Sequence, residues 1–182
     1  TREDAVGDAF DKVARMLGLP YPGGPQISAI ALKGQKNPNV VLPRPMLHSK
    51  DLDFSFAGIK TAVRYLIDKL GVIDEQTKAD IALEFQNAVV EVLVSKVDSA
   101  AREHNPQTFI LGGGVAASSY LRGELTKLFA EKHPTVQAIL PPRELTTDNA
   151  AMIAAAAYIQ TVYHVAPQKS FRAEGNLKLA NQ

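Results

Sequence analysis

The stretch FILGGGVAASSYLR, residues 109–122, joins an apolar run to three glycines, a step of small residues and a helix-like pattern. Glycines between a strand and a helix let the backbone approach a ligand closely, at the sheet edge where nucleotides commonly bind. Gly112, Gly113 and Gly114 are therefore candidate binding residues. A tight turn without a ligand is an equally good interpretation of the local pattern. The stretch is neither a P-loop, which needs a terminal Gly-Lys-Ser/Thr, nor the dinucleotide motif GxGxxG.

Strands and helices alternate around this stretch. QTFIL at 107–111 is typical of a buried strand, VQAILP at 136–141 is expected to be another strand, and helices are expected over 119–132 and 148–163. This order predicts a parallel sheet. Two or three strands are too few for a covered α/β sheet, so we expect further strands before the first residue, which is not a methionine.

The chain before this unit is mainly helical. One short strand is expected at LDFSF, residues 52–56, and Thr77 with Asp80 resembles a capping box that opens a long helix. Apolar spacing predicts helices over 3–17, 26–33, 57–70 and 77–103.

These patterns predict two domains of an α/β, helix-rich chain. Residues 1–104 form a largely helical subdomain with one short strand, and residues 105–182 form a β-α-β-α unit. The polar tail of this unit, from residue 167, is expected to be loosely packed.

Composition excludes several classes of protein. The 182 residues are 46% hydrophobic and 21% charged, as in ordinary globular proteins, and the absence of cysteine excludes disulfides, thiolate metal sites and a cysteine nucleophile. The net charge of +1 gives no global basic field, so nucleic-acid binding needs a local patch or a partner. The longest apolar run, residues 150–159, is too short to span a bilayer, so we expect a cytoplasmic protein without a membrane anchor.

Carboxylates are the main remaining chemical signal. Asp148 lies where a strand passes into a helix and is a candidate ligand or simply a helix cap. Asp4, Asp8 and Asp11 share one helix face, where such a stripe is usually solvated. The four histidines lack ligand spacing such as H-x-x-x-H, and no Ser-His-Asp pattern is visible, so the sequence holds no complete metal site.

Five separated segments together resemble one family. They are EDAVGDAFDKVARMLGLPYPGGP, FSFAGIKTAV, EFQNAVVEVL, LGGGVAASSYLR and TTDNAAMIA, in this order. They resemble the carboxyl half of the bacterial tRNA threonylcarbamoyladenosine synthase family, TsaD, historically named O-sialoglycoprotein endopeptidase or glycoprotease. The resemblance runs from about residue 3 to residue 165.

The resemblance implies a fold and an activity. The fold is part of the actin/Hsp70-like ATPase fold, which has two ribonuclease-H-like lobes. The activity is transfer of threonylcarbamoyl from threonylcarbamoyl-AMP to the adenosine next to the anticodon of tRNA, in the cytoplasm. The family carries iron or zinc, binds threonylcarbamoyl-AMP or ATP/ADP, and works with a shorter homologous subunit and an ATPase subunit. Its amino half, with the H-x-x-x-H ligands, is absent here, so the chain is expected to be a fragment that is inactive alone.

The resemblance also assigns roles to single residues. Asp11 matches an aspartate that holds the adenylate ribose, Gly24 matches a glycine that lines the same pocket, and Asp148 matches a metal ligand. The family asparagine that contacts the nucleotide is replaced by Ser118, which lacks the paired donor and acceptor of an amide. Some members have an aspartate where this chain has Ser28.

Three alternative functions stay open at this point. A metal-dependent glycoprotease is disfavoured because no H-E-x-x-H motif is present. An actin/Hsp70-like nucleotide-binding module without acyl transfer shares the fold, but it does not carry the FDK and YPGG segments. A non-catalytic interaction domain is favoured if the folded chain binds no ligand.

Overall fold

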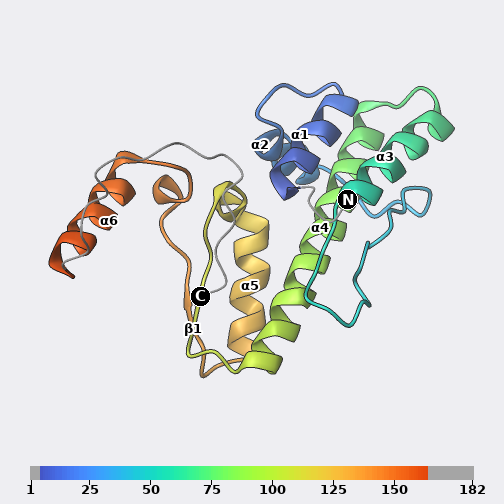
Figure 1. Ribbon diagram of the computed structural model, residues 1–182. Coiled ribbons are helices and arrows are strands. Elements are labelled where there is room, and N and C mark those ends of the chain that lie inside the picture. Colours follow the sequence, from blue (N-terminus) through green and yellow to red (C-terminus); the bar gives the residue numbers. More distant parts are fainter. Residues whose placement is uncertain (1–4, 164–182) are drawn as a thin grey trace. The chain divides into compact units, whose positions relative to one another are not determined.

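The computed structural model describes residues 5–163 and separates the chain into two compact units (Figure 1). The first unit ends at Thr147, and the second begins at Asp148. The domain boundary predicted at residue 104 lies inside the first unit and stays a prediction about how that unit subdivides. The polar tail predicted from residue 167 lies outside the described residues.

The described part of the first unit is mostly helical, with one small sheet. Its elements, in chain order, are α1 (Val6–Met16), α2 (Gly23–Ala31), α3 (Ala57–Leu70), α4 (Glu75–His104), β1 (Thr108–Ile110), the 3-10 helix η1 (Gly114–Ala117), α5 (Ser119–Lys132), β2 (Gln137–Ile139) and the 3-10 helix η2 (Arg143–Leu145).

Helix α4 carries the first hydrophobic cluster on its amino-terminal half, where α1, α2 and α3 pack (Figure 1). Phe10 of α1 meets Phe85 of α4 edge-on, with ring centroids 5.0 Å apart. Ile27 of α2 and Ile59 of α3 are fully buried in the same cluster. The apolar spacing that predicted these helices therefore corresponds to faces that meet in one core.

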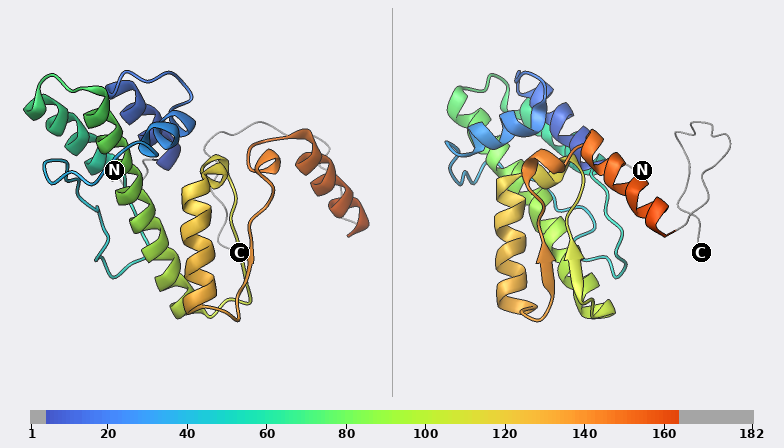
Figure 2. Two further views of the ribbon diagram at one scale, coloured as in Figure 1. Left: turned by 180° about the vertical axis from the view of Figure 1, so that it is seen from behind. Right: turned by 90° about the vertical axis from the view of Figure 1, so that its left-hand side faces the viewer.

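A second cluster joins the carboxyl-terminal half of α4 to α5 and the sheet. Phe129 of α5 packs on Phe109 of β1 with ring centroids 4.7 Å apart. The strands β1 and β2 are parallel and lie side by side, with Phe109 opposite Ala138 (Figure 2). The predicted parallel pairing and the β-α-β order are confirmed.

The prediction that the strand at residues 107–111 is buried is wrong. Phe109 is half-buried, but Ile110 is 68% exposed and every residue of β2 is exposed. Successive strand residues face opposite sides of a sheet. Within the described residues of the first unit, only the side that faces the second cluster is covered.

The strand predicted at residues 52–56 is also wrong, because this segment pairs with no other strand in the described chain. Its alternation has another cause. Phe56 is completely buried in the first cluster, and Phe54 packs on it with ring centroids 5.7 Å apart. The preceding loop is held by Lys96 of α4, whose Nζ donates to the carbonyl of Asp51 at 2.7 Å.

Three predicted helix starts need correction. Helix α2 begins at Gly23 instead of residue 26, so the glycines form its first turn. Helix α4 begins at Glu75, because the side chain of Asp74 accepts from the backbone of Thr77 at 2.8 Å. In the second unit, α6 spans Ala150–Val162 and is capped by Asn149, whose side chain accepts from Met152 at 2.9 Å.

Asp80, predicted as part of the cap of α4, instead binds the loop after α2. Its carboxylate accepts from Gln35 N at 2.8 Å, from Asn37 Nδ2 at 2.9 Å and from Gln76 Nε2 at 2.8 Å. Burial raises the pKa of Asp80, but these hydrogen bonds outweigh it and leave the pKa below its ordinary value. The ionised carboxylate therefore stabilises the fold.

Replacing Asp80 by asparagine is expected to lower the free energy of unfolding by about 1–3 kcal/mol at neutral pH, because the amide cannot accept all three bonds. Since the folded pKa is depressed, the advantage of the wild type is present above the unfolded pKa of about 3.9 and is lost as the pH falls through the folded value. Urea unfolding at pH 7 and pH 3 measures both effects. Asp68→Asn, at an exposed position on α3, is the control. An equal difference at both pH values would contradict the prediction.

The second unit is described by itself. All side chains of α6 are exposed among its described residues, and its sequence is rich in alanine. Within residues 5–163, no helix combines the length and the apolar character needed to cross a membrane.

Candidate functional site

A pocket of about 820 Å³ lies in the first unit, between the α1–α2 pair and the segment that joins β1 to α5. It brings together five of the residues that the sequence singled out. These are Asp11, Gly24, Ser28, Gly114 and Ser118. Much of the remaining lining is apolar, from side chains such as Phe10 and Val115. Apolar walls with a few polar groups are typical of small-molecule sites.

The helical wall is shaped by a very close approach of α1 and α2. A Cβ atom at Gly23 would lie 2.6 Å from Cα of Asp11, so only glycine fits there. The Asp11 carboxylate accepts from the backbone nitrogen of Gly23 through Oδ1 at 2.7 Å. In the described chain, Oδ2 of Asp11 has no hydrogen-bond partner. Asp11 thus fixes the start of α2 and keeps one oxygen available beside the pocket.

Gly24 and Ser28 complete this wall from α2. No heavy atom lies within 4 Å of a Cβ built on Gly24, so the space beside its backbone is open. The hydroxyl of Ser28 donates to Oε1 of Gln86, a buried residue of α4, at 3.0 Å. The Ser28 oxygen retains lone pairs that can still accept from a ligand.

The glycine wall depends on one unusual backbone conformation. Gly113 has φ 84° and ψ 170°, a combination that only glycine adopts readily. Gly114 begins η1 and lines the pocket, whereas Gly112 and Gly113 are not among the lining residues. Ser118 lines it too, and its Oγ caps α5 by accepting from Leu121 N at 3.3 Å. Of the three glycines, Gly113 therefore sets the turn and Gly114 lines the pocket.

Residues that the sequence reasoning missed complete the lining. Ser119 and Arg143 are both in the pocket wall, and Nη2 of Arg143 donates to Oγ of Ser119. Arg143 follows the carboxyl end of β2, as the glycines follow that of β1. Because parallel strands present these ends at the same sheet edge, the position of Arg143 could have been inferred from the sequence.

The pocket is suited to an anionic ligand. The amino-terminal ends of α2 and α5 both line it, through Gly24 and Ser119, and helix amino termini favour negative charge. Arg143 adds a full positive charge, while Asp11 is the acidic side chain of the lining. Asp11 thus offers an acceptor at one wall, and Arg143 with the amino-terminal end of α5 offers positive potential at the other.

The described residues do not fit a metal centre. In residues 5–163, no three His, Asp or Glu side chains lie together so that they could bind one metal ion. Asp148 belongs to the second unit. His133 is engaged with Asp98, with Nε2 and Oδ1 2.8 Å apart, and Asp8 is paired with Lys12 at 2.7 Å.

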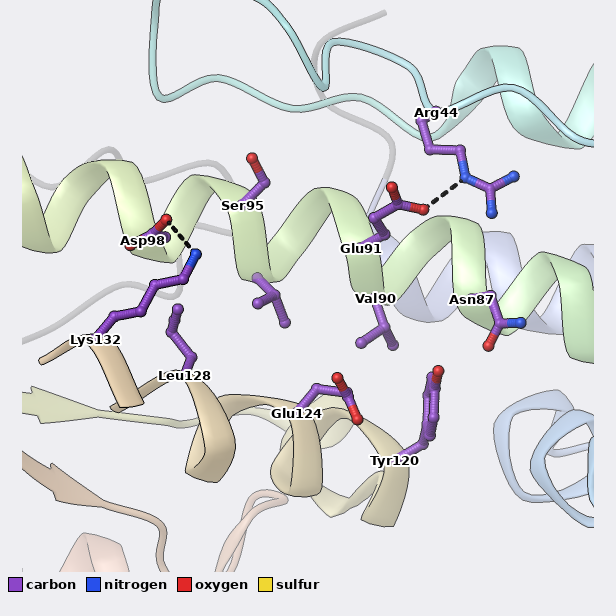
Figure 3. A pocket seen from close by; sticks show the side chains of 11 residues that line it. Arg44, Asn87, Val90, Glu91, Ser95, Asp98, Tyr120, Glu124, Leu128 and Lys132 are labelled. Carbon is purple, nitrogen blue, oxygen red and sulfur yellow. Dashed lines mark hydrogen bonds and ion pairs between the residues drawn. The ribbon is translucent and has the colours of Figure 1, made fainter. Parts of the chain in front are cut away.

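A second hollow, of about 510 Å³, lies between α4 and α5 and contains none of the predicted site residues (Figure 3). Its charged side chains pair with each other. Glu91 accepts from Arg44 at 2.8 Å, and Asp98 accepts from Lys132 at 3.2 Å. Burial raises the pKa of Asp98, but hydrogen bonds from His133 and Lys132 hold it below its ordinary value. The pair of Asp98 with Lys132 ties α4 to α5, whereas Arg44 ties the loop before α3 to α4.

The architecture is that of a helix-rich α/β chain with a pocket at the carboxyl end of two parallel strands. The family model described as TsaD, tRNA N6-adenosine threonylcarbamoyltransferase, matches residues 1–155. The chain belongs to this family.

Curated relatives agree with this assignment. A tRNA N6-adenosine threonylcarbamoyltransferase of Thermosipho africanus is 47% identical over 179 residues, which are 98% of this chain and 53% of the relative. The protein of the same name from Moorella thermoacetica is 51% identical and covers 88% of this chain and 46% of its own length. That of Bacillus subtilis is 47% identical, and the match covers 87% of this chain and 45% of the relative. The chain thus spans about half the length of these relatives.

Proposed function

We propose that this chain forms the nucleoside-binding part of a tRNA N6-adenosine threonylcarbamoyltransferase. The whole protein would transfer threonylcarbamoyl from threonylcarbamoyl-AMP to the adenosine next to the anticodon of tRNA. The observation that carries the proposal is the single pocket in which Asp11, Gly24 and Ser28 face Gly114 and Ser118. These positions come from segments that are far apart in the sequence. The family resemblance assigns Asp11 and Gly24 to the adenylate pocket, whereas at Ser28 and Ser118 this chain differs from the family's aspartate and asparagine.

In this proposal, Asp11 binds the ribose of the adenylate. Its Oδ1 is held by Gly23, which leaves Oδ2 to accept from a ribose hydroxyl in the pocket that Asp11 lines. A charged acceptor gives a hydrogen bond that is about twice as strong as a neutral one. Ser118 contributes a hydroxyl that can donate to the ligand while its oxygen caps α5.

The anionic part of the adenylate would lie toward Ser119 and Arg143. The first backbone N–H groups of α5 and the guanidinium of Arg143 provide the positive potential that a phosphate needs. The alternative interpretation of the glycines, a tight turn without a ligand, does not account for a pocket with this distribution of charge.

The reaction requires orientation more than an acid or base from this chain. The exocyclic amine of adenosine forms a bond to the carbamoyl carbon, the bond from that carbon to the phosphate oxygen breaks, AMP leaves and the amine loses a proton. The proposed contribution of the pocket is to hold the adenylate so that the carbamoyl carbon faces the amine. When bound, iron or zinc would supply Lewis acidity, with Asp148 as one proposed ligand.

Further features of the whole protein are part of the same proposal. They include the actin/Hsp70-like fold of two lobes, a cytoplasmic location, and a shorter homologous subunit and an ATPase as partners. A transfer assay with threonylcarbamoyl-AMP and unmodified tRNA tests the activity in the whole protein. ATP hydrolysis without tRNA modification would instead support a nucleotide-binding module, and peptide cleavage would support a glycoprotease.

Replacing Asp11 by alanine is expected to weaken binding of a stable threonylcarbamoyl-adenylate analogue at least tenfold, because a charged hydrogen bond contributes about 1.5–3 kcal/mol. The fold should lose only about 1 kcal/mol, from the lost bond to Gly23. Titration calorimetry and urea unfolding of the whole protein measure the two effects.

Two further variants make this test specific. Asp11→Asn keeps an acceptor for Gly23 and should bind with intermediate affinity. Asp8→Ala removes a carboxylate one turn earlier, which pairs with Lys12 outside the pocket lining, and should bind like the wild type. Affinity at the wild-type level in Asp11→Ala would contradict the proposed ribose contact.

A further inference from the structure

Arg122 lies on the first turns of α5 and does not line the pocket. Its guanidinium nevertheless contacts both loops that follow the strands. Nη1 donates to the carbonyl of Ala116 at 3.0 Å, and Nη2 donates to the carbonyls of Leu140 at 3.0 Å and Pro141 at 2.7 Å. One side chain therefore bridges the segment after β1 and the segment after β2.

These two loops form the same wall of the pocket. The loop after β1 supplies Gly114 and Ser118, and the loop after β2 supplies Arg143 and Thr147. Past these strands, which are three residues long each, the described residues show one further backbone bond between the two segments, from Leu111 N to the carbonyl of Ile139 at 3.1 Å. The contacts of Arg122 add to it farther along. Leu140 and Pro141 lie between the end of β2 and Arg143, and Ala116 lies within the lining segment, between Val115 and Ala117.

The local sequence makes an arginine suitable for this task. Pro141 and Pro142 have no N–H groups, so the segment after β2 has few donors with which to fix itself. Arginine presents five N–H donors in a rigid planar fork, which can serve several carbonyls at once. A lysine in the same place can offer only a compact ammonium group, without the fixed fork.

We infer that Arg122 is a positioning residue, which holds the two strand-end loops so that Gly114, Ser118 and Arg143 form one ligand-binding wall. The inference rests on the proposed function for the identity of the ligand. Arg122 acts through the loops and touches no reacting group.

The test uses hydrogen exchange and AMP binding in the whole protein. The exchange probes are four amides that the loops themselves protect, because each donates to a nearby carbonyl. They are Ala116, Ser118, Leu145 and Thr146. In Arg122→Ala, we expect these amides to exchange about tenfold faster, with α4 amides unchanged, since the opening is local. AMP affinity should fall about tenfold or more, because small displacements of binding groups have large effects.

Arg122→Lys should restore part of both properties. Lys127→Ala is the matched control, since it removes a positive charge from the same helix at a side chain that pairs with Glu124 at 2.7 Å. Unchanged exchange in the loops of Arg122→Ala, or a uniform rise that includes α4, would overturn the inference. Loosened loops with wild-type AMP affinity would overturn it as well. If the wild type binds no AMP, the proposed function fails, and the exchange result still decides whether Arg122 holds the loops.

Discussion

Replacing Gly34 by alanine is expected to lower the free energy of unfolding by about 3 kcal/mol, the upper end of the range for overpacking. Gly34 follows α2 and packs directly on α4. A Cβ atom there would lie 2.4 Å from the carbonyl oxygen of Ala79 and 2.8 Å from Cβ of Leu83. The first of these atoms belongs to helix backbone that bonds within α4, so it cannot move without disturbing the helix. Urea unfolding monitored by circular dichroism measures the loss.

Gly123→Ala is the matched control for Gly34→Ala. Gly123 lies inside α5, and no heavy atom lies within 4 Å of its added Cβ. Alanine in a helix interior is more favourable than glycine by about 0.5–1 kcal/mol, so this variant should gain stability. The change from glycine to alanine is thus expected to lower the free energy of unfolding at Gly34 and to raise it at Gly123. A loss below 1 kcal/mol in Gly34→Ala would contradict the close packing of α2 on α4.

Replacing Gly113 by valine in the whole protein is expected to reduce adenylate affinity at least a hundredfold. With φ at 84° and ψ at 170°, Gly113 adopts a conformation that costs other residues about 1–3 kcal/mol, and a β-branched side chain fits it worst. No heavy atom crowds the added Cβ, so the effect comes from the backbone. The turn must change its path, which displaces Gly114 and the start of η1 from the pocket wall.

Gly112→Val separates this backbone effect from added bulk in the loop. Gly112 is adjacent, does not line the pocket and has open space around an added Cβ, and its φ lies outside the left-handed region. The affinity of Gly112→Val for the adenylate analogue should stay within about threefold of that of the wild type. Calorimetric titration of both variants decides the matter. Equal affinity in Gly113→Val and the wild type would mean that the glycines serve the turn and not the ligand.

Helices α1–α4 were predictable because each has an apolar stripe at helical spacing and these stripes meet in the first cluster. Phe10, Ile59 and Phe85 each belong to the stripe of a different helix, and all three are buried there. Exact helix starts were less predictable, because several polar residues close together in the sequence can each cap the same helix. Asp74 and Asp80 are both plausible partners for the start of α4, and only the position of Gln35 explains why Asp80 turns toward the loop instead.

The alternation at residues 52–56 misled for a different reason. Its apolar side chains do not share one buried face, because Phe56 is fully buried in the first cluster whereas Phe54 is 40% exposed and packs against Phe56. Alternating apolar residues therefore do not by themselves require pairing with another strand.

The sequence predicted individual residues of the candidate site. It did not predict the hydrogen bonds that hold these residues in place. The family resemblance pointed to Asp11, Gly24 and Ser118, which the structure places in one pocket. The bond from Gly23 to Asp11 and the bridge from Arg122 to Leu140 join positions whose proximity depends on tertiary packing. No spacing rule in a single sequence encodes such contacts.

Helix α4 belongs to both hydrophobic clusters of the first unit. Val89 and Val92 belong to the cluster around α1–α3, Val90 belongs to the cluster around α5, and Leu93 packs against both. Neighbouring residues on one 30-residue helix thus serve two cores. Opening either core disturbs the helix that the other requires, so the two cores are coupled into one cooperative unit. The pocket proposed for the adenylate has one wall on each core and is therefore lost or kept as a whole.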